Sequence, residues 1–117
     1  MKADDLRQRT KNYALRIIRL YRKLPRSKES EVVGVQLLRS GTSVGAQFRE
    51  GYRAKSKADF ISKITGSVQE LDESLYWLEL LGEAEIVPIE RLEPLMQETN
   101  ELIAILTTIL KGQRDYK

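Results

Sequence analysis

Apolar residues recur three and four positions apart along most of this 117-residue chain, which is the spacing of one face of an α-helix. Four stretches carry the pattern, at about residues 3–23, 30–53, 57–81 and 88–111, and only a few residues separate them. Nothing in the pattern suggests a strand. Long helices joined by short connections favour antiparallel neighbours. The sequence therefore predicts an all-α protein, a single-domain antiparallel four-helix bundle with up-down-up-down topology over residues 1–117.

Each predicted helix has an apolar stripe that we expect to face the core. The ends of the helices are marked by Ser30 as an N-cap and by Gly82 as a stop. Pro88 and Pro94 cannot both be the first residue of one helix, so we expect a turn or kink before the main part of the fourth. The stripes are Leu6, Tyr13, Ala14, Ile17, Leu20, Tyr21 and Leu24 in the first helix, Val33, Leu37, Val44, Phe48 and Tyr52 in the second, Phe60, Ile64, Val68, Leu71, Leu75 and Leu78 in the third, and Leu95, Met96, Leu102, Ile103, Leu106, Ile109 and Leu110 in the fourth.

The second predicted helix contains four glycines, and each costs roughly 1 kcal/mol relative to alanine. Gly34, Gly41 and Gly45 fall on one line, which favours a groove that lets another helix approach closely. The alternative is that the bare backbone admits a ligand. The opposite side carries a polar stripe, which is either a solvated face with Arg39 paired locally or a contact between subunits or with a ligand. That stripe is Gln36, Arg39, Ser43, Gln47 and Glu50.

Charge is distributed unevenly, although the net charge is only +3. Residues 1–28 carry +8, residues 29–64 carry +2 and residues 65–117 carry −7. The first helix places Arg9, Arg16, Arg19, Lys23 and Arg26 along one strip, an array that could bind the phosphates of RNA or DNA. The competing interpretation is that these cations pair with the acidic third and fourth helices, within one subunit or between subunits.

Four large apolar residues lie off the predicted core stripes, and tryptophan near leucines is typical of the centre of an interface. We interpret them as a site of self-association, with a broader core or a partner-protein site as alternatives. These residues are Leu15, Trp77, Leu80 and Leu81.

The chain has neither histidine nor cysteine, which removes the commonest general base, the Ser-His and Cys-His nucleophile systems and nearly every ordinary zinc site. Carboxylate pairs such as Asp72 with Glu73, or Glu98 with Glu101, leave a metal-dependent enzyme as a distant third possibility. We expect no enzymatic activity, cofactor or metal. No stretch is long and apolar enough for a membrane span or a signal peptide, so we expect a cytoplasmic protein.

A run of motifs resembles a known family. The elements are Arg39, Ser43, Gln47 and Glu50-Gly51, then Phe60, then Ser67 and Glu70 within Gly-Ser-x-x-Glu-Leu. In this order they resemble the four helix bundle proteins, also called 23S rRNA-intervening sequence proteins. Gln47-Phe48-Arg49 stands where that family typically has asparagine and small residues.

The resemblance implies a four-helix protomer, a ring-like homo-oligomer with five subunits and no catalytic activity. The family is similar to the basic accessory proteins of diversity-generating retroelements, which bind nucleic acid. We therefore predict a non-enzymatic, homo-oligomeric accessory protein associated with RNA or DNA. The alternative is a protein-binding scaffold or antitoxin-like module, whose basic first helix meets an acidic partner protein.

Overall fold

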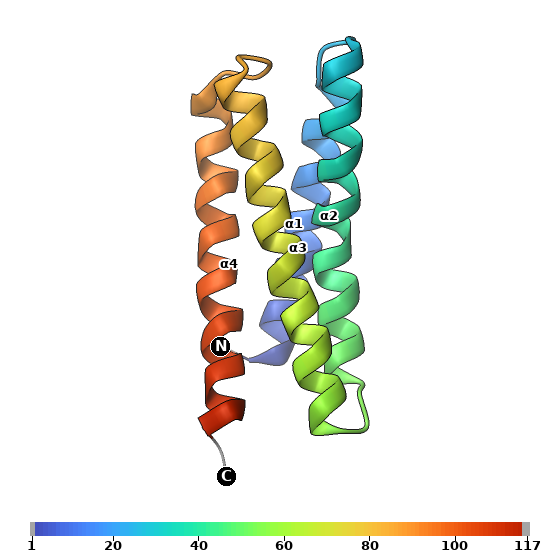
Figure 1. Cartoon of the computed structure of the whole chain (residues 1–117), viewed down its shortest axis with the longest axis vertical. Coiled ribbons are helices and arrows are strands. Elements are labelled where there is room, and N and C mark those ends of the chain that lie inside the picture. The colour runs from blue at the N-terminus through green and yellow to red at the C-terminus, as the bar shows by residue number, and fades with distance from the viewer. Residues whose placement is uncertain (1, 116–117) are drawn as a thin grey trace.

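A computed structural model describes residues 2–115, with side chains through residue 113. Four helices account for almost all of it: α1 (Ala3–Arg22), α2 (Lys28–Tyr52), α3 (Lys57–Glu83) and α4 (Ile89–Asp115). They run alternately up and down along a body of about 50 × 21 × 19 Å, so that α1 begins and α4 ends at the same end (Figure 1). The described residues contain no strand. The predicted all-α antiparallel bundle is confirmed.

Helices adjacent in the sequence pack together along their length, most extensively α2 with α3. In contrast, α1 and α4 approach each other closely at only a few positions, and α1 lies diagonally across the bundle from α3 (Figure 1). No helix among the described residues is long and apolar enough to cross a membrane. The bundle therefore has one loosely closed seam, between α1 and α4.

The core contains most of the predicted apolar stripes and also several hydroxyl side chains that apolar spacing did not indicate. Ser40 and Ser74 are wholly buried, and their Oγ atoms lie 2.7 Å apart in a hydrogen bond between α2 and α3. Ser67 Oγ donates to the backbone oxygen of Val44 at 2.9 Å. Small hydrogen-bonded residues at these positions allow the two helices to approach closely without leaving polar atoms unsatisfied.

The glycine line of α2 faces α1, as the packing interpretation predicted. A Cβ atom at Gly41 would lie 2.7 Å from Cγ1 of Ile17, and one at Gly45 would lie 3.2 Å from Oγ1 of Thr10. Because a side chain at these positions would meet α1, the glycines are explained by close helix packing rather than by a ligand.

Two predicted helix ends are wrong, and so is the turn expected before the main part of the fourth helix. The N-cap of α2 is Ser27, whose side chain accepts a hydrogen bond from the backbone N–H of Ser30, so the helix begins earlier than predicted. Helix α3 continues through Gly82 to Glu83, and the chain turns instead at Glu85, which has a positive φ of 60°. Helix α4 runs without interruption through Pro94, because this residue lies near the helix start and removes only one backbone hydrogen bond.

Candidate functional site

Arg9, the first cation of the predicted phosphate-binding strip, is held by α4. Its Nε and Nη2 atoms each donate to Glu98 at 2.7 Å, and Nη2 also donates to Glu101 at 2.7 Å. The hydrogen bonds that the guanidinium donates to Glu98 raise its pKa above the ordinary value, and only 24% of the side chain is exposed. Arg9 therefore fits the competing interpretation, in which a cation of α1 pairs with an acidic helix, and it closes the α1–α4 seam near the start of α1.

A buried hydrogen bond closes the seam beside this ion pair. Tyr13 lies in the core, with its hydroxyl 2.7 Å from Oγ1 of Thr99, which also donates to the backbone oxygen of Leu95 at 2.7 Å. Burial raises the pKa of Tyr13 to about 12. Helices α1 and α4 are thus joined over one turn near the ring of Tyr13.

Farther along α1 the seam opens into a groove of about 370 Å³. Arg16, Arg19 and Lys23 line it from α1, and Arg91, which sequence reasoning missed, lines it from α4. None of these four has an ion pair or hydrogen bond with the described residues, although Glu90 also lines the groove. Three of the five predicted phosphate contacts therefore lie together in one cationic groove.

Arg26 lies apart from this groove, in the connection between α1 and α2. It lines a separate hollow together with Tyr21, Arg22 and Glu31. The Tyr21 hydroxyl donates to the Glu31 carboxylate at 3.0 Å, and this hydrogen bond raises the pKa of the tyrosine. Arg22 and Arg26 thus add to the cations near the end of α1.

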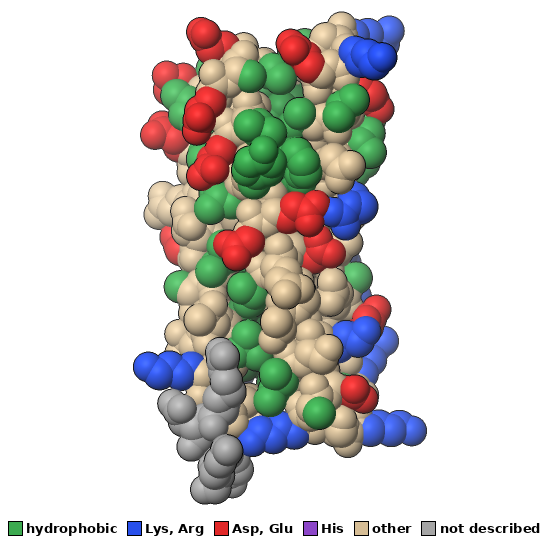
Figure 2. Space-filling model, in the orientation of Figure 1, with side chains coloured by type: hydrophobic (Ala, Val, Ile, Leu, Met, Phe, Trp, Pro, Cys, Tyr) green, Lys and Arg blue, Asp and Glu red, His purple; other side chains and the backbone are tan. Residues whose placement is uncertain are grey.

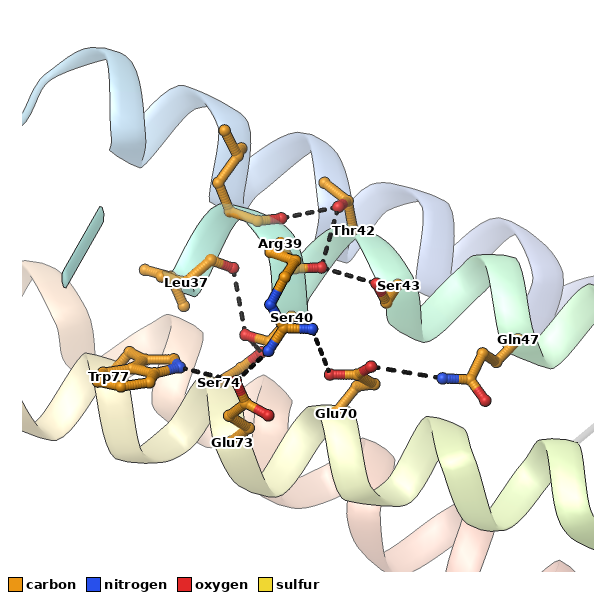
Figure 3. A network of polar contacts seen from close by, with 11 residues as sticks. Leu37, Arg39, Ser40, Thr42, Ser43, Gln47, Glu70, Glu73, Ser74 and Trp77 are labelled. Atoms are coloured by element: carbon orange, nitrogen blue, oxygen red, sulfur yellow. Dashed lines mark hydrogen bonds and ion pairs between the residues drawn. The ribbon is translucent and has the colours of Figure 1, made fainter. Parts of the chain in front are cut away.

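The family motif forms a polar network on the surface where α2 packs against α3 (Figure 3). Arg39 reaches from α2 to Glu73, with which it forms an ion pair, and to Glu70 at 3.6 Å. Glu70 also accepts a hydrogen bond from Gln47 at 3.4 Å, and Trp77 donates to Glu73 at 3.3 Å. Burial is the main cause that raises the pKa of Glu70, while Arg39 opposes the shift.

The network settles how the polar stripe of α2 is used within the protomer. Arg39, Gln47 and Glu50 pair with side chains of α3, and half of the Arg39 side chain remains exposed to solvent. Ser43 donates to the backbone oxygen of Arg39 at 2.8 Å, and Glu50 pairs with Lys63 at 3.0 Å. The stripe therefore lies at the edge of the α2–α3 contact, with Arg39 paired within the protomer. A contact of this stripe with another subunit or a ligand stays a prediction.

The remaining motif residues serve the same contact. Ser67 is buried between the helices, and a Cβ atom at Gly51 would lie 2.9 Å from Cδ1 of Ile64. Phe60 is half-buried, with its ring 5.0 Å from that of Tyr52. Much of the family motif therefore serves to pack α2 against α3.

Hydrophobic side chains gather on the upper half of the face formed by α2 and α3, with carboxylates beside them on the α4 side (Figure 2). We call this the apolar patch. It comprises Val32 and Val35, two turns and one turn before Arg39 on α2, together with Tyr76, Trp77 and Leu80, one to two turns after Glu73 on α3. The first three are the most exposed, at 57%, 42% and 52%, while Trp77 and Leu80 are half-buried.

Two residues predicted to lie at a subunit interface are not part of the apolar patch. Leu81 has no exposed surface and belongs to the core, so its assignment to an interface is wrong; a broader core than the predicted stripe explains it. Leu15 is 37% exposed on α1, on the side of that helix away from its buried residues. Helix α1 lies behind α2 and α3 in the view of Figure 1, and Leu15 is on the outer side of α1, so Leu15 and the apolar patch lie on different faces of the protomer.

Three of the four carboxylates considered as metal ligands are already engaged. Glu98 and Glu101 bind Arg9, and Glu73 binds Arg39. In the part of the chain that the structure describes, no three acidic side chains converge in a way that could hold a metal ion.

The fold and these surfaces define a small all-α bundle whose distinctive features are a close α2–α3 contact and a cationic groove. The model of the 23S rRNA-intervening sequence protein family matches residues 3–108. The chain therefore belongs to this family. Comparison with curated proteins found no match.

A solved structure agrees with this assignment. The chain is similar to a protein of unknown function from the S23 ribosomal protein family of Bacteroides thetaiotaomicron, with 38% sequence identity and a TM-score of 0.88. The match covers 95% of this chain and 99% of that one. Neither the family nor this structure is described with an enzymatic activity.

Proposed function

We propose that the protein is a non-enzymatic, homo-oligomeric accessory protein that binds RNA or DNA through the cationic end of α1. One contrast carries the proposal. Arg9 is neutralised by two carboxylates, whereas Arg16, Arg19 and Lys23 on the same helix have no ion pair with the described residues. An acidic second half was available to pair with all of them, and it pairs with only the first.

Unpaired cations in one place are what phosphate binding requires. Each phosphate that a lysine or arginine neutralises releases condensed counterions, so affinity depends on the number of cations and falls with salt. The groove supplies four such groups from two helices, and Arg22 and Arg26 extend the cationic surface around the end of α1. This arrangement supports nucleic-acid binding without requiring any base to be recognised.

Two surfaces on different faces support self-association. The apolar patch on α2 and α3 adjoins the acidic half of the bundle, and Leu15 lies on the basic helix α1. Contacts that join two different faces produce a closed ring when the rotation between subunits allows it. The pentamer and the likeness to retroelement accessory proteins remain predictions from the family resemblance.

The proposal is tested by measuring binding of the purified protein, freed of bound nucleic acid, to labelled RNA and DNA at low and at physiological salt. We expect binding that weakens steeply as salt rises. Failure to bind either nucleic acid at low ionic strength would contradict the proposal. One acidic protein that co-purifies in stoichiometric amount, without nucleic acid, would favour the protein-binding module instead.

A further inference from the structure

The groove between α1 and α4 has two properties that a purely electrostatic phosphate contact does not need. It is recessed, with a volume of about 370 Å³, and part of its lining is apolar. The apolar part comprises Leu20, which is half-buried, the exposed Pro94 and Leu95, which is 5% exposed. The groove therefore exposes apolar side chains to solvent between the cations at α1 and Arg91 of α4.

The cations come from both helices that line the groove. Arg16 and Arg19 come from successive turns of α1, Lys23 directly follows that helix, and Arg91 comes from the first turn of α4. Glu90 is the only carboxylate among the described lining residues, so positive charge predominates on the rims. A chain lying in the groove would therefore meet cations on both sides and apolar groups between them.

From this arrangement we propose that the groove binds single-stranded nucleic acid, with phosphates on the cationic rims and a base or sugar against the apolar lining. The inference rests on the proposed function and specifies the ligand. Proteins that hold single strands combine a cationic groove along the backbone with surfaces against which unpaired bases pack, and arginine planes can serve as such surfaces.

A double helix does not fit the same features. Its bases are stacked inside and its phosphates lie on the outside, so it can touch the rim cations but cannot bring a base to Leu20 or Leu95. The groove is also at the small end of the range for ligand sites, about 300–1,000 Å³. Such a space can hold about one nucleotide, and a duplex would span it without entering.

The test compares three labelled probes by fluorescence anisotropy at low salt: an unstructured 20-nucleotide RNA, the DNA of the same sequence and the RNA annealed to its complement. We expect both single strands to bind about tenfold more tightly than the duplex, since stacking and packing of unpaired bases add to phosphate contacts. Equal binding of single strands and duplex would overturn the inference and leave the proposed function standing. Loss of all binding would overturn both.

Two pairs of variants locate the site. Arg91→Gln should weaken single-strand binding roughly threefold or more, whereas Lys111→Gln, an exposed lysine on the same helix, should not. Leu20→Ala should weaken single-strand binding and leave duplex binding unchanged, with Ile105→Ala as a control because both residues are half-buried against the core. Helicity and melting of each variant confirm that it folds.

If Arg91→Gln and Leu20→Ala both fold and both bind single strands as tightly as the parent protein, nucleic acid binds elsewhere and the inference is overturned. An acidic amphipathic peptide that binds in an Arg91-dependent manner, where the single strands do not, would make the groove a protein-binding site and overturn the inference.

Discussion

Replacing Gly41 by alanine tests how closely α1 and α2 pack. The new Cβ atom would lie 2.7, 3.0 and 3.2 Å from Cγ1, Cγ2 and Cβ of Ile17. Ile17 is wholly buried, and its β-branched side chain is stiff, so these atoms cannot rotate away. Accommodation requires the two helices to move apart.

Gly34→Ala is a matched control on the same helix. There the new Cβ atom would lie 2.6 Å from Cδ1 of Leu24, the far end of a half-buried side chain that can swing aside. Both substitutions gain about 1 kcal/mol of helix propensity. Overpacking a rigid site costs about 1–3 kcal/mol. Gly41→Ala should therefore be less stable than Gly34→Ala by about 2 kcal/mol, and less stable than the parent protein.

Urea unfolding followed by circular dichroism, at one fixed protein concentration, measures this difference. A fixed concentration is needed because self-association would add to the apparent stability. If the two variants unfold at the same urea concentration, or if Gly41→Ala is more stable than the parent, the close packing of α1 on α2 is wrong.

Three further predictions concern the seam and the apolar patch. Arg9→Ala should lower the free energy of unfolding by about 1–3 kcal/mol, because it leaves the half-buried Glu98 carboxylate unpaired. Arg16→Ala should change it by less than about 0.5 kcal/mol, and urea unfolding distinguishes the two variants. Because the folded-state pKa of Tyr13 is raised to about 12, the free energy of unfolding should fall by about 2 kcal/mol as pH rises from 10 to 12. Tyr13→Phe should remove that loss and should lower the free energy of unfolding at pH 7 by only about 1 kcal/mol, since Thr99 keeps its backbone partner. Urea unfolding at pH 7, 10 and 12 checks this, and an equal loss between pH 10 and 12 in Tyr13→Phe would contradict it. Trp77→Ala should yield smaller species in light scattering without loss of helicity, and an unchanged mass would remove it from any subunit interface.

The helices and their inward faces were predictable because apolar side chains recur at helical spacing. Buried hydroxyls were missed because that pattern counts serine as polar. A signal was nevertheless present: Ser67 and Ser74 continue the phase of Leu71, Leu78 and Leu81, which are all buried. The same phase would have placed Leu81 in the core.

The candidate site was only partly predictable, because it depends on which helices become neighbours. Arg9 and Glu98 are 89 positions apart, and helical spacing alone does not bring α1 to α4. Glu98 and Glu101, one turn apart, do mark a face that could receive a guanidinium. Arg91 was missed because it lies within the acidic half of the sequence and joins the other cations only through the fold.

The central claim is that unpaired cations of α1 contact phosphates, and the salt dependence of binding tests it most directly. For a single strand, the slope of log affinity against log salt concentration changes by about 0.7 for each phosphate contact. Replacing Arg19 or Lys23 by glutamine should reduce the slope by about that amount, while Lys11→Gln, an exposed cation off the strip, should leave it unchanged. Equal slopes for all of these proteins would contradict the account.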